Sequence, residues 1–120
     1  MKHFLVVLLL FTVVYGTEFE PYGEKLFKEH CMTCHQLETT ELTDNSILKA
    51  PPLDILVHQI KYYYRDEEKF VEYLSDFLRQ PSEDKSICIP CVRRWGLMPS
   101  QQLSDEEIQA IGKWMFNAYR

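Results

Sequence analysis

The chain has 120 residues, which is enough for one ordinary domain and too few for two. Its 18 Asp and Glu residues outnumber its 13 Lys and Arg residues, so its formal charge at pH 7 is −5. This charge disfavours nucleic acids and anionic membranes as partners, and it is compatible with docking onto a basic patch of another protein.

The amino-terminal segment has the pattern of a secretory signal peptide. A basic start at Lys2 is followed by residues 4–14, which carry no charge, and the small residue Gly16 provides a cleavage position. The alternative is a retained membrane anchor, but an apolar run of about 11 residues is shorter than the roughly 17 to 25 that span a bilayer. We expect a cleaved signal peptide at residues 1–16, and a mature domain at 17–120 that has no stable membrane insertion and is exported to a bacterial periplasm.

Hydrophobic spacing and helix-boundary residues predict helices from about residue 21 to 34, from 53 to 64, between Asp66 and Pro81, and after Ser104. The last helix is the best marked, because Ser104 and Glu107 have the spacing of a capping box. Polar residues predict a surface loop at 36–46 and a connector at 79–86. The predicted fold class is all-α.

The sequence Cys-Met-Thr-Cys-His at residues 31–35 is the signature of covalent haem attachment. The thiols of Cys31 and Cys34 can each add across one vinyl group of haem to form a thioether, and His35 is then carried beneath the iron as a ligand. The pattern predicts one covalently bound haem c per chain. Two other interpretations are a local disulfide with an incidental histidine, and a zinc site that would need further ligands.

A second cysteine pair, Cys88 and Cys91, cannot attach a second haem in the same way, because Val92 stands where histidine is required. An oxidising compartment favours a structural disulfide between these two residues. A redox-active dithiol is an alternative, since Arg93 and Arg94 would stabilise a thiolate. Metal binding, or pairing with another protein, is a further possibility.

Three separated segments resemble the class I (monohaem) c-type cytochrome family across nearly all of the mature chain. They are Gly-Glu-Lys-Leu-Phe at 23–27 leading into the attachment motif, Ala-Pro-Pro-Leu at 50–53, and Gly-Leu-Met-Pro at 96–99. The resemblance implies a small fold of three to five helices wrapped around one haem, with the first and last helices crossing closely at Gly23. The segment at 88–94 departs from the family's pattern, and the resemblance gives it no role.

The resemblance also implies two further contacts with the cofactor. The carbonyl of Pro51 would accept the second N–H of His35, which fixes the ring and strengthens it as a donor. The sulfur of Met98 would be the sixth ligand, so His35 and Met98 would hold the iron. The bracketing glycine and proline favour Met98, because a loop can project a flexible thioether onto iron. His58, on a predicted helix near the haem, is the rival ligand.

These features predict a one-electron carrier between a donor and an acceptor redox protein, and not an enzyme. Histidine–methionine ligation suits this task, because it raises the reduction potential and leaves no vacant position for a substrate. We expect the carrier to be a monomer. The alternatives are a haem enzyme or sensor with a labile sixth ligand, and a bis-histidine cytochrome.

Overall fold

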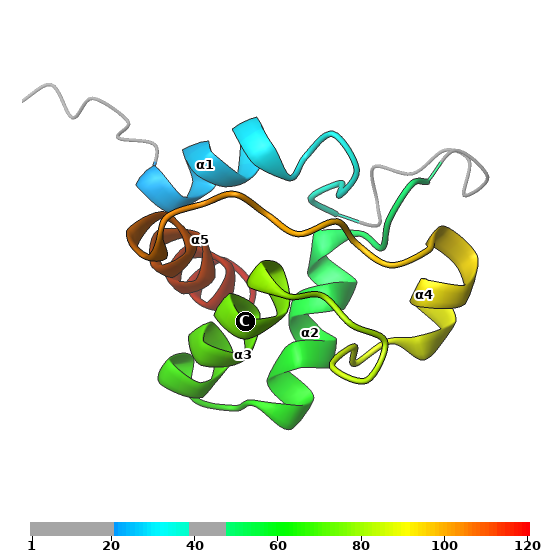
Figure 1. Ribbon diagram of the computed structural model, residues 1–120. Helices are drawn as coiled ribbons and strands as arrows, with labels where there is room; N and C mark the ends of the chain where they lie inside the picture. The colour runs from blue at the N-terminus through cyan, green and yellow to red at the C-terminus, as the bar shows by residue number, and fades with distance from the viewer. Residues whose placement is uncertain (1–20, 39–47) are drawn as a thin grey trace, which may run out of the picture.

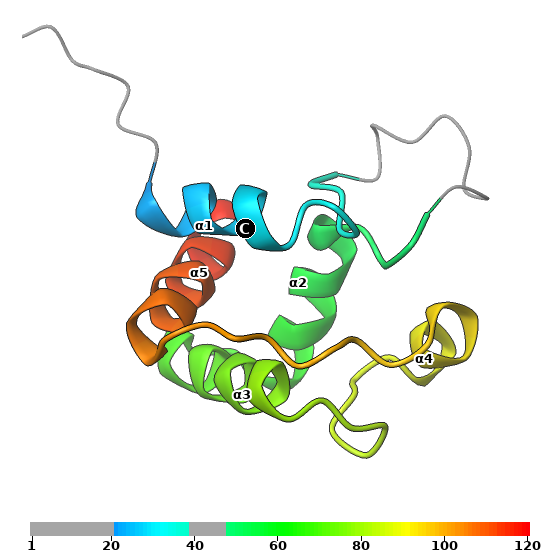
Figure 2. The ribbon, with the colours of Figure 1, turned by 45° about the horizontal axis from the view of Figure 1, so that its top comes forward.

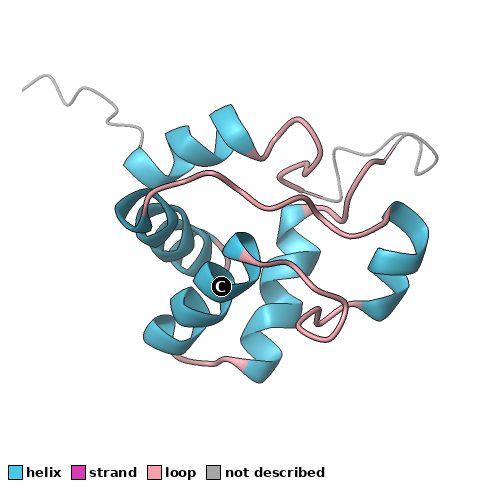
Figure 3. Ribbon diagram, viewed as in Figure 1, coloured by secondary structure: helices cyan, strands magenta, loops and turns pink. Residues whose placement is uncertain are grey.

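The computed structural model describes residues 21–38 and 48–120, and this part of the chain contains five α-helices and no β-strand (Figures 1 and 3). The helices are α1 (Tyr22–His30), α2 (Leu53–Tyr63), α3 (Glu67–Arg79), α4 (Ile89–Trp95) and α5 (Asp105–Ala118). The predicted all-α class is confirmed. The predicted signal peptide and most of the predicted loop at 36–46 lie outside the described residues. None of the helices in the described ranges is long and apolar enough to cross a bilayer.

The helices are arranged around a ring. In Figure 2, α1, α5, α3 and α2 follow one another around it, and α4 lies to one side. Helix α5 packs against both α1 and α3, and touches α2. The side chains with almost no exposed surface come from α2, α3 and α5, and they are Leu53, Val57, Ile60, Phe70, Ile108 and Ile111. The core therefore lies where these three helices meet.

Two helix starts have the predicted caps. The side chain of Asp66 accepts a hydrogen bond from the backbone N–H of Lys69 at 2.9 Å, one turn into α3. Ser104 accepts from the backbone N–H of Glu107 at 3.1 Å, and the Glu107 carboxylate accepts from the N–H of Ser104 at 3.0 Å. Such caps satisfy N–H groups that have no partner within the helix, which fixes where α3 and α5 begin.

Two helical segments differ from the sequence-based prediction. Helix α1 ends at His30, not near residue 34, and residues 31–34 form turns instead. Helix α4 was not predicted at all. It has Pro90 in its first turn and ends at Trp95. The next residue, Gly96, has a φ of 82°, which lies in the left-handed region that favours glycine.

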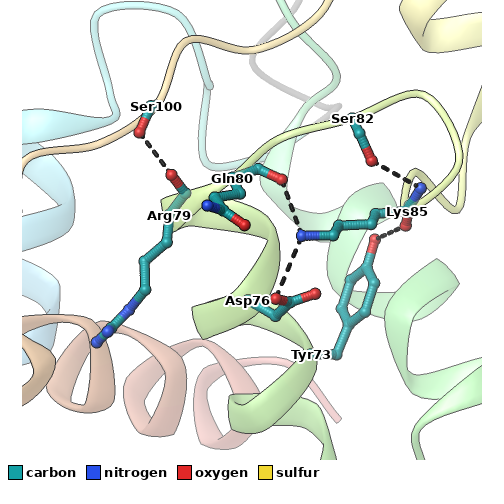
Figure 4. A network of polar contacts seen from close by, with 7 residues as sticks. All are labelled: Tyr73, Asp76, Arg79, Gln80, Ser82, Lys85 and Ser100. Atoms are coloured by element: carbon teal, nitrogen blue, oxygen red, sulfur yellow. Dashed lines mark hydrogen bonds and ion pairs between the residues drawn. The ribbon is translucent and has the colours of Figure 1, made fainter.

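The carboxyl end of α3 anchors the two connecting segments that pass it (Figure 4). The Tyr73 hydroxyl donates to the carbonyl of Lys85 at 2.8 Å, and the Lys85 ammonium lies 3.2 Å from an Asp76 carboxylate oxygen. The Ser100 hydroxyl donates to the carbonyl of Arg79 at 2.6 Å. The polar connector after α3 and the segment that leads into α5 are thus both attached to the same helix end.

Helices α1 and α5 cross at Gly23, as the resemblance implies. Gly23 is buried, and a β-carbon placed on it would collide with the carbonyl oxygen of Ala110 and lie 2.6 Å from the β-carbon of Trp114. Only a residue without a side chain allows the two backbones to approach so closely.

Replacing Gly23 with alanine should lower the free energy of unfolding by at least about 2 kcal/mol, because the added methyl group meets backbone. Gly112→Ala is the matched control. Its added β-carbon would lie 3.1 Å from a Val71 methyl group, and the gain in helix propensity should keep the change within about 1 kcal/mol. Urea denaturation of both variants measures the difference. Equal effects at the two positions would contradict the close crossing at Gly23.

Candidate functional site

A cavity of about 380 Å³ lies inside the ring of helices. Its volume is within the range of about 300 to 1,000 Å³ that ligand and cofactor pockets occupy. All five residues that the sequence assigned to the haem site line it, namely Cys31, Cys34, His35, Pro51 and Met98. Much of the remaining wall is apolar, including Phe27, Leu53, Leu56, Ile60, Leu74, Phe77, Leu78 and Ile111. The structure therefore brings together the five predicted site residues, which are separated by up to 67 positions in the sequence.

The attachment motif forms a tight turn at the end of α1. The backbone N–H of Cys31 donates to the carbonyl oxygen of Phe27 at 2.8 Å. The N–H groups of Cys34 and His35 donate in turn to the carbonyl oxygen of Cys31, at 3.2 and 2.9 Å. These bonds place both cysteines and the histidine within one turn, each lining the cavity.

Cys31 and Cys34 are free thiols in the structure, so the local disulfide considered above is not formed. Cys31 is buried and Cys34 is exposed. Burial raises the pKa of the Cys31 thiol to about 11, and the neighbouring Cys34 adds to the shift. Cys31 is therefore protonated at neutral pH, so it is a poor metal-binding thiolate. Thioether formation keeps the sulfur uncharged, which suits this buried position.

His35 is held in one orientation by the segment before α2. Its Nδ1 lies 2.8 Å from the carbonyl oxygen of Pro51, which can only accept, so Nδ1 carries the proton and donates. Burial lowers the pKa of the His35 imidazole, and the Pro51 carbonyl partly opposes this shift. The ring is thus neutral near pH 7, and Nε2 keeps a lone pair for a metal ion. The contact that the resemblance implied between His35 and Pro51 is present.

The start of α2 is fixed to the residues that follow the motif. The backbone N–H groups of Leu53 and Asp54 donate to the carbonyls of Gln36 and Leu37 at 2.7 and 3.1 Å. The hydroxyl of Tyr119, just beyond α5, donates to the same Leu37 carbonyl at 2.9 Å. Because the chain is held directly after His35, the imidazole has little freedom to swing away from the cavity.

Met98 lies in the segment between α4 and α5 and is half-buried. Figure 2 shows this segment and the turn after α1 at separate edges of the ring. The backbone N–H of Gly96 donates to Val92 at 2.8 Å, which ends α4, and the N–H of Gln101 donates to the Leu78 carbonyl of α3 at 2.9 Å. The thioether of Met98 is therefore on a short span between the end of α4 and an attachment to α3.

Cys88 and Cys91 are joined by a disulfide, as predicted, with their Cα atoms 5.2 Å apart. The bridge lies at the start of α4, where the N–H of Cys91 also donates to the Cys88 sulfur at 3.2 Å. In this state neither sulfur is available as a zinc ligand. Among the described residues, no three His, Cys, Asp or Glu side chains meet as a metal-binding group. Both bridged cysteines line the cavity.

The rival ligand His58 does not line the cavity, and its side chain is exposed on α2. Residues that had no predicted role at the site also line the cavity, among them His30, Lys49, Tyr73 and Trp95. His30 precedes the motif directly, and Trp95 lies three positions before Met98. Closeness to the two motifs was therefore a signal for both of these residues. Nothing in the local sequence marked Tyr73 or Lys49.

A relative of the chain occurs in Aquifex aeolicus (strain VF5), where its description is "uncharacterized protein". The two are 26% identical over 136 aligned positions, which cover 100% of this chain and 90% of the relative. No protein-family model matches the chain, and no solved structure matches it. This identity does not establish a family, so a functional assignment has to depend on the residues of the site.

The double variant Cys88→Ser/Cys91→Ser should lose at most about 2 kcal/mol of unfolding free energy, because the closed loop is very short. The parent treated with a reductant is the control, and it should lose the same amount. Denaturant titration gives the free energies, and intact mass reports the two hydrogens gained on reduction. A parent that gains no mass on reduction would show that the bridge is absent in solution.

Proposed function

We propose that this protein is a monohaem c-type cytochrome that carries single electrons between two redox proteins. The observation that carries the proposal is a single apolar cavity that two thiols, a neutral imidazole and a thioether all line. When bound, haem supplies a one-electron couple between ferrous and ferric iron.

The residues of the cavity fit this cofactor. Cys31 and Cys34 are uncommitted thiols in one turn, as two thioether bonds to one ring require. Nε2 of His35 and the sulfur of Met98 are the nitrogen and sulfur donors typical of electron-transfer haems. The apolar walls suit a flat and largely apolar macrocycle.

The side chains of this chain would have separate tasks. The two cysteines fix the cofactor's position, and Pro51 holds His35 in the tautomer that binds metal. The apolar walls exclude water, which favours the less charged, reduced iron and so raises the potential. The span bearing Met98 is attached to α3 just beyond the methionine, which would help the sulfur to keep its place when the charge of the site changes.

The alternatives are supported less well. A bis-histidine site would need His58 in the cavity, but His58 is exposed on α2 and does not line it. A haem enzyme or sensor needs a labile sixth position, whereas the segment around Met98 is anchored to α3. These two observations favour the electron carrier.

The proposed setting is the periplasm, with a donor and an acceptor protein as partners and the carrier itself a monomer. The Cys88–Cys91 disulfide supports an exported location, because such bridges persist in oxidising compartments. The excess of acidic residues supports docking onto basic surfaces.

The purified protein should contain covalently attached haem. Its intact mass should exceed that of the mature polypeptide by one haem group, and acid–acetone should fail to extract the colour. Changing Cys31, Cys34 or His35 should abolish the coloured protein, since the thioethers or the iron ligand are lost. Thr33→Ala is the matched control, since Thr33 lies inside the same motif but is exposed and does not line the cavity, so this variant should leave the haem content unchanged. Extractable haem, or none, would refute the proposal.

Met98→Ala should lower the reduction potential, abolish the methionine–iron charge-transfer band and yield high-spin or differently ligated iron. His58→Ala is the matched control and should leave the spectrum unchanged, because this side chain is exposed and outside the cavity. Absorption spectra in both oxidation states and a potentiometric titration measure these effects. The reverse pattern would indicate a bis-histidine site, and a high-spin parent that binds carbon monoxide readily would indicate an enzyme or sensor.

A further inference from the structure

A hydrogen bond connects the end of α4 to a segment 47 positions earlier in the chain. The indole Nε1 of Trp95 donates to the carbonyl oxygen of Leu48 at 2.8 Å. Trp95 is the last residue of α4 and lines the cavity, and Met98 follows three positions later. We call residues 96–101, which include Met98, the Met98 span. The bond from Trp95 to Leu48 is therefore an attachment point immediately before this span.

The same short segment also holds His35. Leu48 is three residues before Pro51, whose carbonyl accepts the Nδ1–H of His35 at 2.8 Å. Two carbonyls of residues 48–51 thus accept side-chain hydrogen bonds from two different parts of the site, the imidazole after α1 and the indole at the end of α4. We call residues 48–51 the bridging segment.

The attachments of the Met98 span differ at its two ends. Downstream, Ser100 and Gln101 hydrogen-bond to the carbonyls of Arg79 and Leu78 at the end of α3. Upstream, α4 has no fully buried side chain. The disulfide joins two residues of the α4 start to each other, so it cannot attach α4 to another element. The hydrogen bond from the indole N–H of Trp95 to the Leu48 carbonyl ties this end of the span to another segment of the site.

We propose that Trp95 is a positioning residue, which holds Met98 in place by fastening the end of α4 to the bridging segment that also orients His35. This inference rests on the proposed function for the role of Met98 as a ligand. The geometry couples the positions of Met98 and His35. A displacement of the bridging segment moves both the carbonyl that holds Trp95, upstream of Met98, and the carbonyl that accepts from His35. Loss of the indole N–H frees the upstream end of the span and leaves the Leu48 carbonyl without this donor.

The decisive variant is Trp95→Phe, which keeps an aromatic ring at the end of α4 and removes only the donor and part of the ring. The probe is imidazole, added to the oxidised holoprotein, which competes with Met98 for the iron. Loss of one hydrogen bond should make the span open more readily, so the variant should bind imidazole about fivefold more tightly than the parent. Imidazole binding is measured during the titration as the loss of the methionine–iron charge-transfer band.

Trp114→Phe is the matched control. Trp114 lies in α5 with its ring 5.4 Å from that of Phe27, and it does not line the cavity. This variant loses an indole and some packing in α5 but keeps the Met98 span and its hydrogen bonds. Its affinity for imidazole should therefore equal that of the parent. Equal imidazole affinities for Trp95→Phe and Trp114→Phe would overturn the proposal.

Hydrogen exchange followed by mass spectrometry gives a readout that does not depend on iron. In Trp95→Phe, amides in the peptides that cover residues 96–101 and 48–53 should exchange faster together, and those of α5 should not. Unchanged exchange in both peptides would show that Trp95 does not fasten them. A parent that lacks the charge-transfer band would overturn the proposed function, and the exchange result would still decide whether Trp95 ties the two segments together.

Discussion

The close crossing of α1 and α5 at Gly23 is the contact on which the position of the candidate site depends. Because α5 also packs against α3, this crossing fixes the direction in which α1 leaves the core and therefore where the turn at residues 31–35 lies. The buried side chains of α1, Leu26 and Phe27, belong to the same core, and Phe27 also lines the cavity. A single close helix contact thus aligns the attachment motif with the interior.

From this starting point, hydrogen bonds to backbone carbonyls position the remaining parts of the site. The bridging segment at 48–51 accepts from His35 on one side and from Trp95 on the other, while the end of α3 accepts from Ser100 and Gln101. Carbonyl acceptors are well suited to this task, since they belong to the backbone and cannot change rotamer. The flexible thioether of Met98 is thereby placed by a framework that is stiffer than the side chain itself.

The sequence predicted the helices that carry strong local signals. Asp66 and Ser104 marked the starts of α3 and α5. The apolar faces of both helices are buried largely as expected, although Phe77 is only half-buried. Helix α4 could not be predicted in the same way, since it spans only seven residues and has no fully buried side chain, so its apolar pattern is too short to mark a helix. The prediction also placed the end of α1 too late in the chain. The turn after His30 is closed by hydrogen bonds between backbone groups, which the pattern of side chains does not reveal. The grouping of Met98 with residues 31–35 came from motif resemblance, since local spacing contains no information on contacts so distant in sequence.

The second cysteine pair acquires a physical role once α4 is recognised as a helix. A helix of seven residues without a buried face is not stable alone, so its conformation depends on local constraints at its ends. The disulfide between Cys88 and Cys91 and the proline between them restrict the first turn, and Gly96 permits the left-handed conformation that ends the last one. These constraints determine where Trp95 projects, and hence whether its indole reaches Leu48. In the proposed cytochrome, the oxidising compartment that favours the disulfide would therefore also favour the α4 conformation that keeps methionine near the iron.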